Sequence, residues 1–583
     1  MVDGTAPGGP EEPRRPVRRG PARRRVLGLA AATFASSRPW AGTAAAGPAG
    51  PARPRPQGGA PSPAYGLDVR AENSLPGAPD WRIRHAGPVG AVEGFTDRVS
   101  VRSGEVFGLH VSTTSASYTV SAYRMGWYGG ARARLVWRSA ALPGERQPAA
   151  VRDPVTRMVH APWRRSAAVD TRGWPEGCYL LRLDTTDGRA QRYVPVTVRG
   201  PAGSADPAAS TASTASTGAA GAAGAAGAPV AAADAAHPGL AGRVVVVNAV
   251  ATWQAYNRWG GADMYQGATG KKDSRSLAVA FDRPYANRLG AGQFLFFELP
   301  LIALAERLGL PLAYATGVDV AREPELLRGA AAVVSPGHDE YWTPEQRRHV
   351  TLARDTGTNL AVFGANCCYR RVRYEPSALG ADRVVVCWKD DYAADPGYRR
   401  GLPPTTDFRR QPAPDPESSL LGVIYEGYPV DAPYVVSHAG HWLLAGTGVR
   451  AGDAFPHLVG VEYDRVDTGY PTPRPVEILA HSPVVCKGRA SYADTAYVSL
   501  PGGAGVFATG TMRWVEALDA SGPPGGKGNH GLGGDAGRFT RVVTENVLKA
   551  FARGPAGRAR PALDNVLAHY GEAAPAPAAR SGV

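Results

Sequence analysis

The sequence predicts two folded domains of different class, a small all-β sandwich followed by an α/β domain with a mostly parallel sheet. Short β-rich runs separated by turn residues fill residues 64–200, and apolar runs alternate with helical periodicity in residues 241–555. Between them, residues 201–240 consist almost entirely of Ala, Gly, Ser, Thr and Pro. Because 583 residues are too many for one hydrophobic core, we expect domain boundaries at these changes of composition.

Residues 1–63 are predicted to be an export signal of the twin-arginine type within a Pro/Ala/Arg tail. Three arginines, Arg23-Arg24-Arg25, precede a short Ala-rich apolar run that ends at Phe34. This run is far shorter than the roughly 20 residues that span a bilayer. We therefore expect an exported protein, extracellular or in the cell envelope, without a membrane span. The alternative is a tail that reflects compositional bias alone.

The basic charge does not indicate a nucleic-acid partner. Residues 1–63 contain ten arginines and three acidic residues, which account for half of the formal net charge of +14. Downstream of this segment no Lys/Arg-rich helix or aromatic-interleaved basic stripe stands out in the sequence. We therefore expect a small-molecule ligand.

The first domain is predicted to be an antiparallel sandwich because its β-rich runs are short and evenly separated by turn residues. The expected strands are Val106–Val111, Tyr118–Tyr123, Ala133–Trp137, Tyr179–Leu183 and Arg192–Val198. The following segment, 201–240, has too few apolar residues to bury and is expected to be a flexible linker.

The second domain is predicted to be a βαβ series, because continuous apolar runs such as Val244–Val247 are typical of strands buried on both faces. The other expected elements are a helix over Phe294–Leu308, strands at Leu312–Ala315, Ala330–Val334 and Leu360–Phe363, and a helix that Thr343-Pro344 begins and Gly357 ends. After about residue 380 the pattern is mixed and its topology stays open. Residues 556–583 are expected to be a C-terminal tail.

Polar and aromatic residues follow three of the predicted parallel strands. They are the segments TWQAYNRWGG from Thr252, SPGHDEYW from Ser335, and GANCCYRR from Gly364. Because ligands bind beyond the carboxyl ends of strands in open parallel sheets, we expect these segments to meet in one crevice.

Seven blocks follow one another in the second domain: TWQAYNRWGG, FDRPY, SPGHDEYW, NLAVFGANCCYRR, HWLLAGTG, LVGVEYD and GVFATGTMRW. Together and in this order, they resemble the C-terminal domain of the large (beta) subunit of the N,N-dimethylformamidase family, over roughly residues 241–552. The resemblance implies a glutamine-amidotransferase-like α/β fold and an iron-dependent amidohydrolase. It also implies one mononuclear iron held by two tyrosines and a glutamate.

Carried over to this sequence, the resemblance assigns the metal ligands Glu340, Tyr256 and Tyr285, with Tyr265 in reserve. A phenol has a pKa near 10, so it becomes a ligand only beside a strongly Lewis-acidic ion, which points to Fe³⁺. Such a metal activates water for attack on an amide C–N bond. The resemblance places His338, Asn366 and Glu462 around that reaction, the first two as oxyanion donors and Glu462 as the proton carrier. The expected substrate is a small amide, and the sequence does not identify the molecule. The presence of a small subunit and the oligomeric state also stay open.

Other interpretations of the same residues are also open. The His338-Asp339-Glu340 turn could cap the next helix, and Tyr256 could be a core ring. Cys367 and Cys368 suggest a cysteine hydrolase, although the second glycine of a nucleophile elbow is absent there. The five cysteines show no disulfide framework.

The alternative for the whole protein is an exported, non-catalytic binding or surface protein that keeps the fold without the metal. His438 and His441 could form a separate metal pair, although loop histidines are usually solvated.

Overall fold

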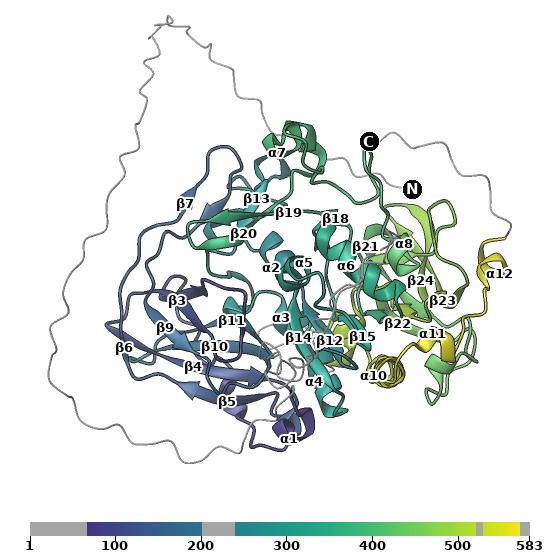
Figure 1. Cartoon of the computed structure of the whole chain (residues 1–583), viewed down its shortest axis with the longest axis horizontal. Coiled ribbons are helices and arrows are strands. Elements are labelled where there is room, and N and C mark those ends of the chain that lie inside the picture. The colour runs from purple at the N-terminus through teal and green to yellow at the C-terminus, as the bar shows by residue number, and fades with distance from the viewer. Residues whose placement is uncertain (1–66, 201–239, 520–528, 572–583) are drawn as a thin grey trace, which may run out of the picture. The chain divides into compact units, whose positions relative to one another are not determined.

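The computed structural model describes residues 67–200, 240–519 and 529–571 (Figure 1). The predicted export signal and nearly all of the predicted linker lie outside the described residues. All the described residues belong to one compact unit, Ser62–Val583. Within the described ranges, no helix is both long and apolar enough to cross a membrane.

The N-terminal region is β-rich, as predicted, and two of its sheets form its core. One has the order β1 (Val92–Thr96), β3 (Val106–Thr113), β9 (Ala167–Asp170); the other has the order β2 (Ser100–Arg102), β11 (Gln191–Arg199), β10 (Gly177–Thr185), β4 (Ser117–Met125), β5 (Ala133–Arg138), with β6 (Leu142–Pro143) beside β4. Apolar side chains from both sheets, such as Leu109 and Leu181, share one core. Each expected run falls within a strand, but β2 pairs with β11 in parallel.

The second region is built around a seven-stranded sheet. Its order is β14 (Leu312–Thr316), β12 (Val244–Asn248), β15 (Ala332–Ser335), β17 (Asn359–Val362), β25 (Gly505–Ala508), β24 (Arg489–Ser499), β23 (Val476–Cys486). The pairs from β14 to β25 are parallel, and β24 and β23 continue the sheet in antiparallel pairs. The region is therefore a mixture of α and β with a largely parallel sheet, as the sequence predicts.

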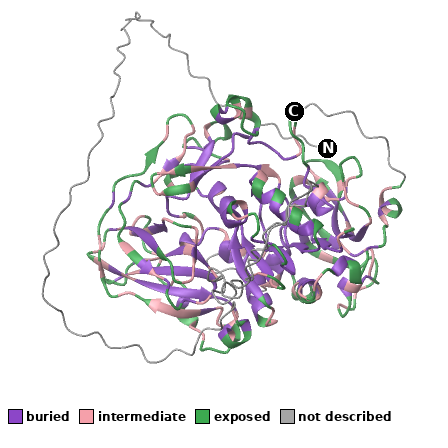
Figure 2. Cartoon of the chain, in the orientation of Figure 1, coloured by how far each residue is buried: buried purple, intermediate pink, exposed green. Residues whose placement is uncertain are grey.

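The sheet buries both faces because alternate residues of its strands enter two different cores. Val244 and Val246 pack with helices α4 (Leu299–Arg307) and α10 (Gly534–Phe551). Val245 and Val247 pack with the elements α5 (Gly317–Arg322), α6 (Pro344–Asp355), α8 (Ser418–Leu421) and α12 (Val566–Tyr570). Figure 2 shows the central strands buried. This double burial explains why the strands are continuous apolar runs.

One predicted helix is interrupted. The expected helix over 294–308 is divided into α3 (Phe294–Phe297) and α4, with Glu298 between them in a non-helical conformation. The Glu298 carboxylate turns inward and accepts hydrogen bonds from Asn248, the Ala249 amide and Trp253. By contrast, α6 begins at Pro344 with Thr343 as its cap, as predicted.

The remaining α-helices and strands are α1 (Val69–Asn73), β7 (Val151–Arg152), β8 (Val159–His160), α2 (Val250–Ala255), β13 (Ala278–Ala280), β16 (Tyr341–Trp342), β18 (Arg370–Arg371), β19 (Arg373–Ser377), β20 (Gly380–Val386), α7 (Pro396–Arg399), β21 (Ile424–Val435), β22 (Ala454–Arg465), α9 (Trp514–Leu518) and α11 (Ala556–Ala559). The predicted C-terminal tail begins with folded chain, since the Leu563 amide donates to Glu477 of β23.

The two regions are joined by buried polar contacts. Arg124 of β4 and Glu306 of α4 form an ion pair of 2.5 Å in which both side chains are fully buried. Tyr314 of β14 also donates to Glu306. Because a buried charge without its partner is strongly unfavourable, this pair fixes the sandwich against the parallel sheet.

We predict that Arg124→Met lowers the free energy of unfolding by about 3–5 kcal/mol, because it leaves the Glu306 carboxylate buried without its cation. Urea unfolding followed by circular dichroism measures the change. Arg538→Ala, which breaks the exposed Arg538–Asp535 pair, is the control and should change little. Equal effects of the two substitutions would contradict this account of the interface.

Candidate active site

The parallel strands bring three polar segments to one end of the sheet. When the five parallel strands are numbered in chain order, their order across the sheet is 2-1-3-4-5. The direction in which strands are added to the sheet therefore reverses between β12 and β15. Ligand sites of doubly wound sheets lie at this switch point, beyond the carboxyl ends of the strands. Tyr256 follows β12 and α2, Glu340 follows β15, and Asn366 follows β17. The topology therefore places all three segments around the switch point.

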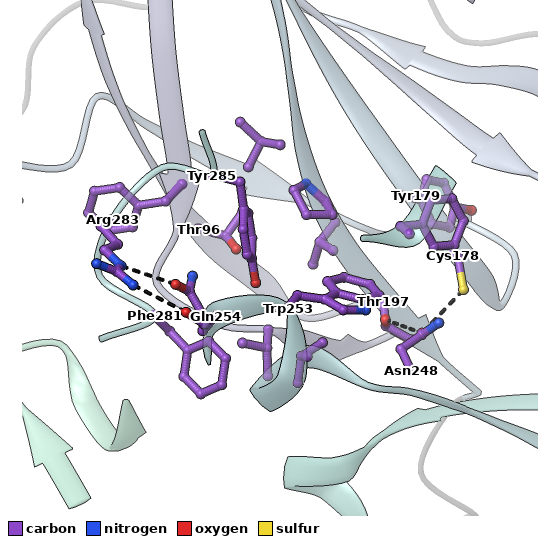
Figure 3. Close-up of a pocket in the computed structure, with 17 residues that line it drawn as sticks. Thr96, Cys178, Tyr179, Thr197, Asn248, Trp253, Gln254, Phe281, Arg283 and Tyr285 are labelled. Atoms are coloured by element: carbon purple, nitrogen blue, oxygen red, sulfur yellow. Dashed lines mark hydrogen bonds between the residues drawn. The ribbon is translucent and has the colours of Figure 1, made fainter. Parts of the chain in front are cut away.

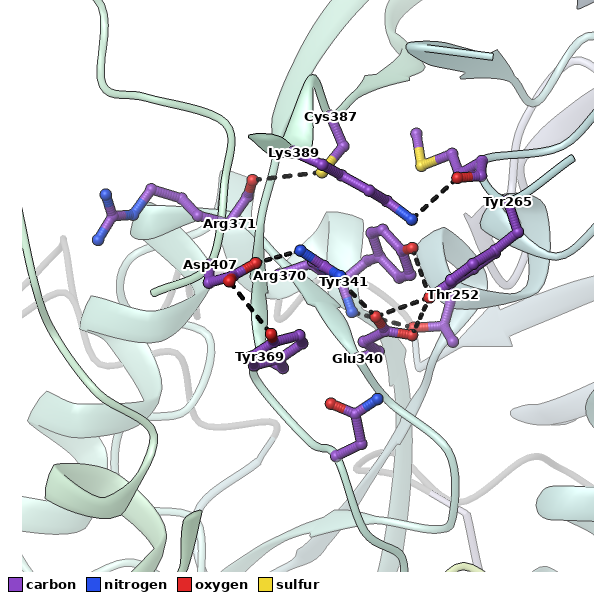
Figure 4. Close-up of polar contacts among 12 residues, drawn as sticks. Thr252, Tyr265, Glu340, Tyr341, Tyr369, Arg370, Arg371, Cys387, Lys389 and Asp407 are labelled. Atoms are coloured by element: carbon purple, nitrogen blue, oxygen red, sulfur yellow. Dashed lines mark hydrogen bonds and ion pairs between the residues drawn. The ribbon is translucent and has the colours of Figure 1, made fainter. Parts of the chain in front are cut away.

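Two phenols and one carboxylate converge there. The Tyr256 hydroxyl donates to Glu340 Oε2 at 2.6 Å, and the Tyr265 hydroxyl lies 2.8 and 2.7 Å from the two oxygens of Glu340. The two hydroxyls are 2.9 Å apart. Figure 4 shows the Glu340 carboxylate facing Tyr265 and Tyr341, and the Tyr341 hydroxyl lies 2.8 Å from that of Tyr265. We call Tyr256, Tyr265 and Glu340 the oxygen cluster.

The three predicted catalytic residues lie beside this cluster. His338 Nε2 is 3.5 Å from Glu340 Oε2 and 3.9 Å from Glu462 Oε2. Asn366 Nδ2 donates to Glu462 Oε2 at 2.8 Å. His338 Nε2 and Asn366 Oδ1 are buried atoms without a hydrogen-bond partner. Buried polar atoms are rarely left unpaired, so these two are suited to contact a bound molecule.

Two basic side chains neighbour the oxygen cluster. Arg370 Nε lies 3.4 Å from Glu340 Oε1, and Arg370 also pairs with Asp407. Lys389 Nζ stands 3.6 Å above the ring of Tyr265 and donates to the Met264 carbonyl at 2.9 Å (Figure 4). Burial lowers the pKa of Lys389 to about 7, whereas Arg370 stays fully charged, so Arg370 is the cation that favours negative charge on the oxygens of the cluster.

The two carboxyl groups of the site have opposite pKa shifts. Burial raises the pKa of Glu340, but the contact with His338 and the charge of Arg370 outweigh it and hold the pKa well below its usual range. Burial, opposed by His338 and reinforced by the charge of Glu340, raises the pKa of Glu462 to about 7. Such a difference between the pKa values of two neighbouring carboxyl groups is typical of sites that carry out acid–base chemistry.

The phenols hold their protons unless a cation is bound. Burial, followed by the negative charge of Glu340, raises the pKa of Tyr256 and of Tyr265 well above the usual value. Ionised phenols therefore require a strongly Lewis-acidic partner, and two phenols with a carboxylate form a hard oxygen donor set. In the parts of the chain that the structure describes, no group of three or more His, Cys, Asp or Glu residues is arranged to hold a metal. The oxygen cluster is of a different kind because phenols supply two of its donors.

Tyr285, our second choice of tyrosine from the sequence, lies elsewhere. It lines a separate pocket with Trp253, Gln254 and Arg283, and its ring centroid is 6.3 Å from that of Trp253 (Figure 3). Tyr265 takes the place beside Glu340. Tyr265 does not follow a strand end. A tight turn, in which Asp263 accepts a hydrogen bond from the Tyr265 amide, brings its side chain to Glu340.

The contacts of the His338-Asp339-Glu340 turn, the two adjacent cysteines and the two loop histidines test the other interpretations of these residues. Thr343 supplies the side-chain cap of α6, so the His338-Asp339-Glu340 turn does not have that role. Cys367 and Cys368 are buried, and burial raises the pKa of both thiols, which makes them poor nucleophiles. His438 Nδ1 lies 2.8 Å from Glu477, with which His441 is also paired.

The fold and this site define an α/β protein with a carboxylate–phenol cluster at the switch point of its parallel sheet. Residues 119–529 match the family described as N,N-dimethylformamidase beta subunit-like, C-terminal. Since this match covers more than half of the chain, the protein belongs to that family. The match begins in β4, so it includes part of the sandwich ahead of the blocks that carry the sequence resemblance. A search of curated proteins gave no match.

We predict that the native protein has no fast-reacting cysteine at the strand ends. A maleimide should label Cys486, which is partly exposed, well before the buried Cys367 and Cys368. Peptide mass spectrometry after timed labelling measures the order. Rapid labelling of Cys367 or Cys368 with loss of activity would instead favour a cysteine hydrolase.

Proposed function

We propose that this protein is an iron-dependent hydrolase that cleaves the C–N bond of an amide with activated water. The observation that carries the proposal is the approach of two phenol hydroxyls and one carboxylate to within 2.6–2.9 Å of one another. Membership of the N,N-dimethylformamidase beta subunit-like family supports an amide as the substrate class.

Tyr256, Tyr265 and Glu340 would hold the iron, with Tyr265 replacing Tyr285 in the ligand set expected from the sequence. Three negatively charged donors match the charge of Fe³⁺, and Arg370 beside Glu340 keeps this carboxylate ionised. When bound, the ferric ion supplies Lewis acidity that makes water nucleophilic near neutral pH.

Glu462 would move the proton in this reaction. A pKa of about 7 would let it accept a proton from the attacking water and return it to the leaving amine. Asn366 fixes this carboxylate by donating to Oε2 at 2.8 Å. The Glu462 side chain is 12 % exposed, whereas that of Glu340 is 1 % exposed, so Glu462 faces the approach of a substrate.

His338 is placed to orient the polar groups and to donate to the oxyanion of the substrate. Burial lowers the pKa of this imidazole, but the contacts with Glu340 and Glu462 raise it above the usual value overall. An imidazole that carries a proton on Nε2 is a donor, and this atom lies 3.5 Å from Glu340 and 3.9 Å from Glu462 without the geometry of a hydrogen bond to either. A donor fixed before the reaction stabilises charge that develops on the amide oxygen.

The proposal includes two features of the wider protein. The strand order 2-1-3-4-5, with functional groups after its first, third and fourth strands, supports a glutamine-amidotransferase-like sheet. The Arg23-Arg24-Arg25 segment supports export, and it lies outside the described residues. The partner we propose is a small-molecule amide.

We predict that the purified protein binds one iron and that Tyr256→Phe, Tyr265→Phe and Glu340→Gln each reduce its iron content severely. The reason is that each substitution removes one donor oxygen from a set of three. Elemental analysis, together with the visible ferric-phenolate absorption, measures the loss. Tyr285→Phe is the matched control, because its hydroxyl belongs to a different pocket, and it should keep its iron and colour.

A wild-type protein that is well folded but holds no iron and no colour would contradict this proposal. The alternative from the sequence, a non-catalytic exported binding protein, would then be preferred. Loss of iron in Tyr285→Phe but not in Tyr265→Phe would instead restore the ligand set expected from the sequence.

We predict that Glu462→Gln lowers amide hydrolysis by roughly 10²–10⁴-fold, because the glutamine cannot carry the proton. N,N-dimethylformamide is the first amide to test, followed by other small amides, with amine release as the measurement. The variant should keep its iron, since Glu462 is outside the oxygen cluster. Glu426→Gln on β21 is the control, and an unchanged rate in Glu462→Gln would exclude the proposed role.

A further inference from the structure

Arg283, in the FDRPY block that begins at Phe281, is fully buried and holds the segment that carries Tyr256. Its guanidinium donates to Gln254 Oε1 at 3.1 Å and to four carbonyls of residues 254–262. These are the carbonyls of Gln254 at 3.2 Å, Asn257 at 2.9 Å, Trp259 at 3.3 Å and Ala262 at 3.2 Å. Figure 3 shows the guanidinium turned toward Gln254. We call residues 254–262 the tyrosine loop.

All five N–H groups of Arg283 are used within the tyrosine loop, so none is left for a ligand. Among the described residues, no carboxylate forms an ion pair with it. Burial lowers its pKa to about 10, which still leaves it charged at neutral pH. Because a buried cation without a counter-ion is unfavourable, the carbonyls that surround Arg283 must compensate for it.

The residues after Arg283 hold the same loop at Tyr256 and at Asn257. Asn287 Nδ2 donates to the Tyr256 carbonyl at 3.0 Å. Asn257 Nδ2 donates to the Pro284 carbonyl at 2.8 Å, and Asn257 Oδ1 accepts from the Ala286 amide at 3.0 Å. The backbone on which Tyr256 stands is therefore fixed at several consecutive positions.

The sandwich closes over the outer side of the loop. Trp259 Nε1 donates to Glu93 of β1 at 3.0 Å, and its ring meets Trp163 edge-on with centroids 5.7 Å apart. Gly260 has a φ of +72°, and a Cβ there would be 2.4 Å from Val159 of β8. The loop thus lies between Arg283 on one side and the sandwich on the other.

We propose that Arg283 is a positioning residue whose planar fork shapes the tyrosine loop and so brings Tyr256, and Tyr265 just after it, onto Glu340. The fork geometry is decisive, because a lysine would keep the charge but present its three donors from a single point. The expected effect of Arg283 on iron binding rests on the function proposed above. Its effect on the conformation of the tyrosine loop is independent of that function.

Hydrogen exchange of the iron-free, full-length protein tests the effect on the loop. In both Arg283→Lys and Arg283→Met, amides of residues 254–266 should exchange at least about tenfold faster than in the wild type. Arg354→Met is the matched control, because Arg354 is also buried and donates to carbonyls, those of Ser419 and Leu420. That control should accelerate exchange near α8 and leave residues 254–266 unchanged.

Titration of the same proteins with Fe³⁺, followed by the visible ferric-phenolate absorption, tests the effect on the site. Binding should weaken at least about tenfold in Arg283→Lys and stay as in the wild type in Arg354→Met. If Arg283→Met does not fold, Asn287→Ala replaces it, since it removes one bond to the Tyr256 carbonyl. It should accelerate exchange in the same residues by a smaller factor.

Wild-type exchange of residues 254–266 in Arg283→Lys would overturn the proposal, and so would faster exchange there with unchanged Fe³⁺ binding. If the wild type binds no Fe³⁺, the iron hydrolase fails and the exchange experiment alone decides the role of Arg283. Faster exchange would then still support the hold on the loop, and unchanged exchange would exclude it.

Discussion

The buried carboxylate of Glu340 is the constraint on which the rest of the site depends. Only 1 % of this residue is exposed, and an anion at such depth must be compensated by hydrogen bonds and opposite charge. The hydroxyls of Tyr256 and Tyr265 and the guanidinium of Arg370 provide this compensation. In iron-free protein the phenols serve as donors. With a trivalent cation in place, the same atoms become the ligands that our proposal requires.

Much of the fold follows from patterns that the sequence displays directly. Runs such as Val244–Val247 are apolar at every position because the sheet buries both of its faces, so they identify parallel strands. The break at Glu298 could not be predicted, because the apolar periodicity continues across it and the cause is tertiary. Its carboxylate turns inward to meet Asn248 and Trp253, which come from another segment of the chain.

Strand ends and the family resemblance each predicted part of the site. Glu340, Tyr256 and Asn366 each follow an apolar run that leads to the same edge of the sheet. The resemblance added Glu462, which lies within β22. Tyr265 is only a reserve candidate from the sequence, since its place depends on a tight turn and on the loop that Arg283 holds. The FDRPY block suggested a ligand, but its contacts indicate a support for the tyrosine loop. An aromatic residue next to a buried arginine can thus mark a scaffold for the site as well as the site itself.

The central claim is that Tyr256, Tyr265 and Glu340 together bind iron. Anomalous diffraction at the iron edge, from crystals of the full-length protein purified without added metal, tests it most directly. The account predicts a single strong peak within about 2 Å of an oxygen from each of these three residues. A well-ordered crystal with a peak elsewhere, for example between His438, His441 and Glu477, or with no peak at all, would contradict it.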